Sequence, residues 1–362
     1  MKERLTIVLM LMLAMAGKSL ADDGLRIEPF EIAANETKKV NIILDDAEEV
    51  YCGLQFDLYL PQGVELCYDE DLEEYMCEPV KAKLGKTHSV LLEQKEKEGA
   101  VFYRFLVSDM KNHTIGSGEI YTLTLTASDM VSTGVQEASF KNVVLSDADQ
   151  QGPEIEAAPF EVTCMVPVNV TSLGYASFSW PRTLDFSETG AQAFIVTEKG
   201  SGSVRLEEVQ TVPAGTGIIV KADEGIYYPQ TTDDEAAADD VSSNLLTGTA
   251  SGSYTVDAEN VFVLSNLSNG EAGFYVADAG VTVAQYKAYL MLADAGDAKD
   301  GGFVFDFTPT GLKTIDNGQL MIDNSPVYNL NGQRVEGSKL NVQSSKLPKG
   351  VYIVNGKKVV LR

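Results

Sequence analysis

The chain has 362 residues, of which 44% are apolar and 22% charged, and its formal net charge is −25. This length predicts roughly two or three domains, and the apolar content excludes a largely disordered chain. The acidity excludes nucleic acid as a partner, because no segment before residue 327 offers the basic face that neutralises phosphates. The simpler interpretation is that the negative charge keeps an exported protein soluble.

The chain begins with a signal-peptide pattern in residues 1–21. Lys2 and Arg4 precede an apolar run, and Ser19 and Ala21 stand at the −3 and −1 positions of a cleavage site. We therefore expect cleavage after Ala21 and export from the cytoplasm. A membrane anchor is disfavoured because the run is shorter than the roughly 20 residues that cross a bilayer. No later segment is long and apolar enough to span, so we expect no integral membrane protein.

Residues 22–163 have the pattern of an antiparallel β-sandwich. Apolar and polar side chains alternate over residues 51–60, which places Gln55, Asp57 and Tyr59 on the outward side of a strand. The acidic stretch that follows fits a short helix or an irregular loop. Alternation recurs in further segments, namely 38–46 and 119–128. We predict an all-β fold with this sandwich first.

Three segments of this region resemble the cohesin-like modules of bacterial surface proteins: GLQFDLYLPQGVEL (53–66), GSGEIYTLTLTA (116–127) and SFKNVVLSDADQQG (139–152). The resemblance covers most of the predicted sandwich. It implies a jelly-roll-type β-sandwich that binds other proteins or stands beside carbohydrate-active domains. No dockerin segment is visible in the chain, so the resemblance names no partner.

Four cysteines follow the predicted cleavage site: Cys52, Cys67, Cys77 and Cys164. Export permits disulfides, and Cys67 and Cys77 are the natural local pair, although four cysteines allow three full pairings. Cys52 falls on the apolar side of its strand and is expected to be a buried thiol. Zinc is disfavoured because the chain contains no CxxC or CxH spacing.

Residues 164–308 form a second β-rich module with short apolar runs between turn clusters. Its segments GYASF, VPAGTG and NLLTGT resemble a module of exported proteins from Bacteroidetes-type bacteria, and that resemblance implies no activity. The only tryptophan, Trp180, lies near Tyr175 and Phe178. These aromatic side chains can form a stacking plane for a sugar, but packing of Trp180 in the core is the favoured interpretation.

Residues 309–362 form a β-hairpin tail in which the frame V-Y-x-x-N-G-x-x-V occurs twice. Asn-Gly favours tight two-residue turns. Residues 327–362 carry seven Lys or Arg and one acid. The tail resembles the C-terminal sorting domain of type IX secretion, which implies recognition by outer-membrane machinery, whereas two ordinary hairpins are the alternative. The resemblance depends on Val327, Tyr328, Asn331, Gly332, Gly350, Val351, Tyr352, Asn355 and Gly356.

Sequence motifs for catalysis are absent. His88 and His113 lie in no HExxH pattern, and the chain has no GxSxG elbow, no P-loop and no dinucleotide fingerprint. We therefore predict that the chain is not an enzyme and needs no cofactor. Calcium is the one metal considered. An EF-hand is disfavoured because Ala158 occupies the twelfth place, where the loop requires a bidentate Glu, so only Asp147 and Asp149 remain as weak candidates.

The expected function is binding by a secreted or surface-displayed protein, with a periplasmic location as the alternative. A protein partner is the first hypothesis, with Gln55, Asp57 and Tyr59 on the contact face. An extracellular glycan is the second, with Tyr59, Tyr175 and Trp180 as stacking residues. A purely structural surface component is the third.

Overall fold

The structure is a computed structural model that describes residues 24–46, 50–85, 87–149, 152, 154–266, 272–294, 296, 298, 301–307, 313–315, 327–329, 350–354 and 357–361. Within these residues, one short 3-10 helix, η1 (Glu235–Ala237), is the only helical element, and the prediction of an all-β fold is confirmed. No helix in the described ranges is long and apolar enough to cross a membrane. The predicted signal peptide and the site after Ala21 lie outside them.

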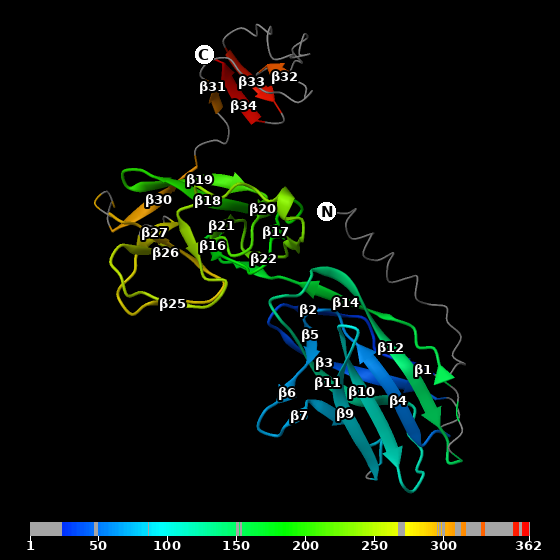
Figure 1. Cartoon of the computed structure of the whole chain (residues 1–362). Helices are drawn as coiled ribbons and strands as arrows, with labels where there is room; N and C mark the ends of the chain where they lie inside the picture. The colour runs from blue at the N-terminus through cyan, green and yellow to red at the C-terminus, as the bar shows by residue number, and fades with distance from the viewer. Residues whose placement is uncertain are drawn as a thin grey trace. The chain divides into compact units, whose positions relative to one another are not determined.

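The described residues form two compact units (Figure 1), divided at Pro167 and Val168, with Tyr228–Thr231 belonging to unit 1. Unit 1 contains a five-stranded and a seven-stranded sheet. The first comprises β1 (Gly24–Arg26), β3 (Thr37–Asp45), β11 (Gly118–Ala127), β5 (Val64–Leu66) and β8 (Cys77–Pro79). The second comprises β2 (Phe30–Ala33), β14 (Phe160–Met165), β12 (Gly134–Ser146), β4 (Gly53–Tyr59), β10 (Ala100–Asp109), β9 (His88–Lys97) and β13 (Glu154–Ile155).

Alternation along the strands builds the core between these two sheets. Phe56 of β4 and Phe105 of β10 stack with their ring centroids 4.5 Å apart, and neither ring is exposed. Phe105 also contacts Tyr121 of β11 at 6.2 Å, which links the two sheets. A β-sandwich therefore forms because one side of each strand supplies apolar side chains to a shared interior.

The acidic stretch after β5 is a hairpin, so the expectation of a helix or an irregular loop is wrong. Its strands are β6 (Tyr68–Asp69) and β7 (Glu74–Tyr75). The amide of Met76 donates to the carbonyl of Cys67 at 2.8 Å and closes the base of the hairpin. Two side-chain contacts also stabilise the hairpin. The ring of Tyr75 lies edge-on to that of Tyr68, and the Tyr75 hydroxyl donates to Gln94 at 2.8 Å.

The predicted bridge between Cys67 and Cys77 is not formed, and both are free thiols. The amide of Cys67 donates to the carbonyl of Thr124, whereas Cys77 is paired with the next residue of β11, Leu123. Successive side chains of a strand point to opposite faces, so the two thiols lie on opposite sides of this sheet. Closeness along the chain therefore does not supply the geometry that a disulfide requires.

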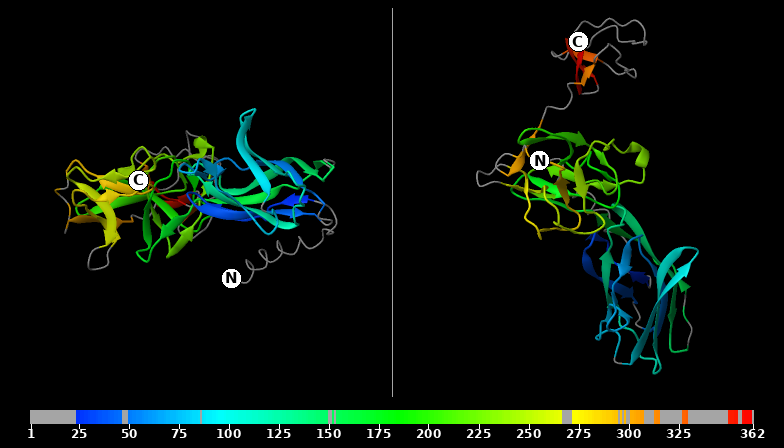
Figure 2. Two further views of the ribbon diagram at one scale, coloured as in Figure 1. Left: turned by 90° about the horizontal axis from the view of Figure 1, so that it is seen from below. Right: turned by 60° about the vertical axis from the view of Figure 1, so that its left-hand side comes forward.

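Unit 2 is built around one strongly curved sheet of nine strands (Figure 2). In sheet order these are β16 (Tyr175–Phe178), β21 (Ile218–Lys221), β18 (Gln192–Lys199), β19 (Ser203–Val209), β30 (Gly302–Asp306), β27 (Ala272–Val276), β26 (Val261–Asn266), β29 (Ala288–Met291) and β24 (Leu246–Gly248). Short ladders add β15 (Val168–Val170), β22 (Gly225–Tyr227), β17 (Leu184–Asp185), β20 (Thr211–Val212), β25 (Tyr254–Thr255) and β28 (Thr282–Val283). The short strand β23 (Gln230–Thr231) belongs to unit 1.

One core lies inside the curved sheet. Phe262, Phe274 and Phe303 are almost completely buried in it, with aliphatic residues from neighbouring strands. Gly273 permits the close approach of two strands, because a Cβ atom there would lie 2.4 Å from the carbonyl oxygen of Phe303. The apolar runs of this module are thus strands, as the sequence predicted.

The described part of the tail is a four-stranded sheet of β31 (Lys313–Ile315), β34 (Lys357–Leu361), β33 (Gly350–Val354) and β32 (Val327–Asn329). The two copies of the repeated frame pair with each other, because Val327 lies opposite Val354 in antiparallel register. β33 also pairs with β34, with Val354 opposite Lys357. Both Asn-Gly dipeptides, 331–332 and 355–356, lie outside the described residues.

Candidate binding surface

The outward side of four adjacent strands in unit 1 forms the candidate site, here called the outer face. Register, together with the stacking of Tyr59 on Phe102, aligns its side chains in three rows across β12, β4, β10 and β9. One row is mostly aliphatic, the middle row is charged and the third contains two rings. The rows are Val144, Gln55, Leu106 and Leu91; then Lys141, Asp57, Arg104 and Glu93; then Ser139, Tyr59, Phe102 and Lys95.

Asp57 lies at the centre of the outer face, but its side chain is only 1% exposed. The hypothesis that it lies open to a partner on the contact face is therefore wrong. Nε and Nη2 of Arg104 donate to its two oxygens, each at 2.7 Å, and Nδ2 of Asn142 donates at 2.6 Å. Burial alone raises the pKa of Asp57, but these hydrogen bonds and the charge of Arg104 lower it below the ordinary value.

A β-bulge in β12 makes this arrangement possible. The register shifts after Lys141, and Asn142 has a positive φ of 51°. Two residues therefore lie beside Asp57, so the Asn142 amide reaches the carboxylate. Lys141 places its ammonium nitrogen 4.5 Å from the ring centroid of Tyr59.

The two rings of the outer face are occupied by neighbours. Tyr59 stacks on Phe102 with a centroid distance of 5.0 Å, and the guanidinium carbon of Arg104 lies 5.5 Å from the Phe102 centroid. Phe102 is buried, whereas Leu106 is 41% and Leu91 is 53% exposed. The accessible chemistry is therefore aliphatic and charged, since Glu93 and Lys95 are exposed as well, and Gln55 is half-buried beside them.

Arg104, Leu106 and Leu91 were missed as candidate residues. The segment VFYRFLV is apolar or aromatic except at Arg104, so only Arg104 was recognisable as an outward residue of a strand, and Leu106 was not. Their position beside Asp57 and Gln55 was not recognisable, because it depends on which strand pairs with β4.

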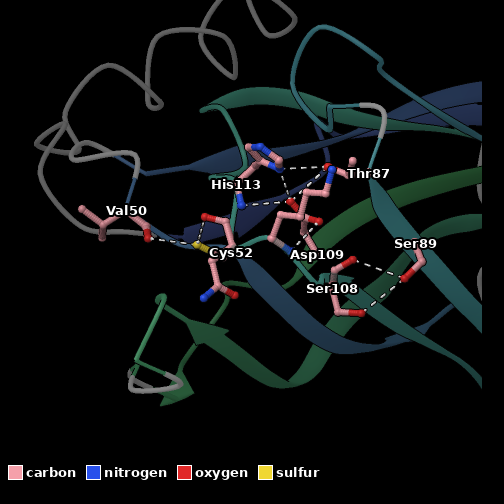
Figure 3. Close-up of polar contacts among 9 residues, drawn as sticks. Val50, Cys52, Thr87, Ser89, Ser108, Asp109 and His113 are labelled. Atoms are coloured by element: carbon pink, nitrogen blue, oxygen red, sulfur yellow. Dashed lines mark hydrogen bonds and ion pairs between the residues drawn. The ribbon is translucent and has the colours of Figure 1, made fainter.

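A second polar cluster lies at the end of β10 (Figure 3). The buried Asp109 carboxylate accepts from the Thr87 hydroxyl at 3.0 Å and contacts Nδ1 of His113 at 2.5 Å. It also accepts from the amides of Lys111 and His113, at 3.1 and 2.9 Å. Burial alone raises the pKa of Asp109, but these hydrogen bonds hold it well below its usual range.

This cluster has the residue types of a catalytic triad without its geometry. Thr87 and Asp109 both contact the same ring nitrogen, Nδ1 of His113, at 2.9 and 2.5 Å. In a triad the nucleophile and the acid occupy opposite ring nitrogens, so that the ring can transfer a proton. The cluster therefore holds the loop after β10 in place and provides no nucleophilic relay.

The nearby thiol of Cys52 is buried, as predicted, and donates to the carbonyl of Asn112 at 3.1 Å. Burial raises its pKa, with further contributions from Asp147 and Asp109, so it is a poor nucleophile. Asp147 accepts the amide of Asp149 at 2.9 Å. Within the described ranges no group of three or more His, Cys, Asp or Glu is placed for a metal, and the calcium hypothesis stays a prediction.

The proposed sugar platform at Trp180 is wrong, because the side chain is 4% exposed. Its ring lies parallel to Phe178 at 5.8 Å and contacts Tyr286 at 4.6 Å. Core packing, the favoured interpretation, explains these contacts. Tyr175 is half-buried and packs against Phe305 at 5.0 Å, away from any shared plane with the buried Trp180.

No protein-family model matches the chain, and no curated protein sequence is similar to it. Solved structures of cohesin modules are similar to two fifths of it. A non-cellulosomal cohesin from Archaeoglobus fulgidus is 12% identical, with 40% of this chain and 91% of that chain covered and a TM-score of 0.30. The cohesin–dockerin complex of OlpA from Clostridium thermocellum is 10% identical, with 40% of this chain and 100% of that chain covered and a TM-score of 0.32. A cohesin from Clostridium perfringens is 13% identical, with 41% of this chain and 98% of that chain covered and a TM-score of 0.30. Such values assign no function to this chain.

Proposed function

We propose that this chain is a secreted or surface-displayed, non-catalytic protein that binds another protein through the outer face of unit 1. The observation that carries the proposal is the ion pair of the buried Asp57 with the half-exposed Arg104, with both hydrogen bonds at 2.7 Å. It fixes the centre of a face whose exposed aliphatic residues, Leu91 and Leu106, lie in one row. A rigid centre with accessible apolar side chains suits a protein interface.

The outer face favours a protein over a glycan. Sugar rings stack on an open aromatic plane, but Tyr59 is stacked on Phe102 and lies under the ammonium group of Lys141. Phe102 is itself buried. The side chains left for a partner include Leu91, Leu106 and the 41%-exposed Arg104, which match the aliphatic and carboxylate groups of proteins.

Export completes the proposal. Residues 1–21 have the charge and apolar run of a signal peptide, and the tail carries the two copies of the sorting-type frame. Partners would then include outer-membrane secretion machinery through the tail. Mass spectrometry of both termini, in surface, periplasmic and medium fractions, tests this part. An intact tail on protein confined to the periplasm would contradict surface display and leave the two hairpins as ordinary structure.

The binding proposal is tested by capture with the chain lacking residues 1–21, using membrane and medium fractions of the source bacterium. Leu106→Glu places a charge on the aliphatic row and is expected to reduce recovery of a discrete partner at least tenfold. Val276→Glu is the matched control, because Val276 is 56% exposed on unit 2. Excess neutral polysaccharide should not displace the partner.

Two outcomes would overturn the proposal. Equal loss with Leu106→Glu and Val276→Glu would place the interface elsewhere. Displacement of the partner by polysaccharide would favour the glycan hypothesis instead.

A further inference from the structure

A pocket of about 350 Å³ lies in unit 2, apart from the outer face. The turn between β15 and β16 forms one wall, with Thr171, Ser172 and Leu173. The last two residues of β26, Ser265 and Asn266, form the other. The volume is at the lower end of the range for small-molecule sites, about 300–1,000 Å³.

The described lining is polar. Among the described residues that line the pocket, three carry hydroxyls, one carries an amide and none is ionisable. Thr171 uses its hydroxyl oxygen for one long contact, 3.4 Å from the amide of Leu173. Within the part of the chain that the structure describes, Ser172, Ser265 and Asn266 make no side-chain hydrogen bond. Within that part of the chain, their donors and acceptors are open to a ligand.

The pocket adjoins the partly exposed edge of the unit 2 core. Alternation along β26 places Asn266 on the same side as Leu264 and the buried Phe262. Leu264 is half-buried and packs against the core cluster, as does Tyr175, two residues after Leu173. Polar groups thus stand beside an apolar and aromatic edge.

We propose that this pocket binds a neutral sugar ring. A pyranose offers several hydroxyls to hydroxyl and amide partners, and one of its faces is apolar enough to lie against side chains such as Leu173. Among the described lining residues there is no cation for a phosphate or carboxylate and no anion for an amine. The site differs from the aromatic platform predicted from sequence, because the buried Trp180 takes no part.

Saturation-transfer NMR on the chain lacking residues 1–21 tests the proposal. The probes are the methyl glycosides of glucose, mannose, galactose and N-acetylglucosamine, with methyl glucuronate as a charged comparison. We expect at least one neutral glycoside to bind with a Kd of about 1 mM, the weak range for a ligand of one ring. The double variant Ser265→Ala with Asn266→Ala should weaken binding roughly tenfold.

Controls separate this site from the outer face and from general damage. Thr282→Ala removes an exposed hydroxyl of unit 2 outside the lining and should leave Kd within about twofold. Leu106→Glu, which reduces protein capture under the proposed function, should also leave sugar binding unchanged. Absence of saturation transfer to all four neutral probes would overturn the proposal, as would tighter binding of the glucuronate or an unchanged Kd in the double variant.

Discussion

The outer face of unit 1 and the Trp180 cluster of unit 2 differ in how they use similar residues. Both regions contain stacked rings, Tyr59 on Phe102 in the first and Trp180 on Phe178 in the second. In the outer face the stack lies beside Leu91 and Leu106, which remain exposed. In unit 2, Tyr286 covers the Trp180 ring, and the cluster belongs to the interior.

The difference shows that an aromatic residue on a strand does not define a binding platform. Exposure depends on neighbours supplied by distant segments, such as Tyr286 for Trp180 and Arg104 for Asp57. The outer face keeps its aliphatic row accessible because no described element of unit 1 packs over Leu91 and Leu106. Variants that remove one neighbour at a time therefore test the comparison directly.

The largest loss of stability is expected for Trp180→Ala. A small loss would mean that Trp180 lies on the surface, and the contrast between the two regions would then fail. Loss of a buried Trp should lower the free energy of unfolding of unit 2 by about 3–5 kcal/mol, through lost burial and a residual cavity. Urea unfolding followed by circular dichroism measures this change. Trp180→Phe, which keeps the stack on Phe178, should cost clearly less. A change below about 1 kcal/mol for Trp180→Ala would contradict core packing.

The next effect sharpens the description of the outer face. Arg104→Ala leaves the Asp57 carboxylate buried without its charged partner and should cost about 2–3 kcal/mol, below the 3–5 of a fully buried pair because Arg104 is 41% exposed. Asp57→Ala should cost less, about 1 kcal/mol, since the remaining guanidinium stays accessible to water. Unfolding by circular dichroism measures both.

The single tryptophan supplies a control for this pair of variants. Its fluorescence follows unit 2, so the fluorescence transition should not move when unit 1 is destabilised. Glu198→Ala, which removes an exposed ion pair with Arg205 at 3.5 Å, should change stability by less than about 0.5 kcal/mol. Equal costs for Arg104→Ala and Asp57→Ala would argue against a buried carboxylate at the centre of the outer face.

Acid should weaken unit 1 through Asp57 and Asp109. Both carboxyls have a lowered pKa in the folded state. Their stabilisation is therefore complete above the unfolded pKa of about 4 and is lost as pH falls through the folded-state pKa. Denaturation midpoints of unit 1 between pH 7 and pH 2.5 should fall, and Asp57→Asn or Asp109→Asn should flatten the slope below pH 4. An unchanged slope in both variants would assign acid sensitivity to other groups.

The smallest effect concerns the thiols. Because Cys67 and Cys77 lie on opposite faces of their sheet, the unreduced and unfolded chain should titrate four free thiols. Dithiothreitol should shift the Tm of unit 1 by less than about 1 °C, whereas loss of a local bridge would remove about 2–3 kcal/mol. Two titrated thiols, with a lowered Tm on reduction, would instead support the predicted disulfide between Cys67 and Cys77.

Local patterns predicted much of the fold. Period-two alternation in residues 51–60 and 119–128 placed Phe56 and Leu123 inward, and both are buried. Turn residues and alternation act between chain neighbours, so they survive in any tertiary context. The hairpin of β6 and β7 was missed because its acidic residues have low strand propensity, and its order comes from Tyr75 contacting Gln94 of a distant strand.

The sequence alone determined the all-β class, the outward direction of Gln55 and Tyr59, and the presence of one basic, repeated tail on an acidic chain. Only the tertiary structure decided that Asp57 is buried, that Trp180 is covered and that Cys67 and Cys77 point apart. The reason is physical: alternation fixes the face on which a side chain lies, whereas burial depends on the segments that pack over that face, and these come from elsewhere in the chain.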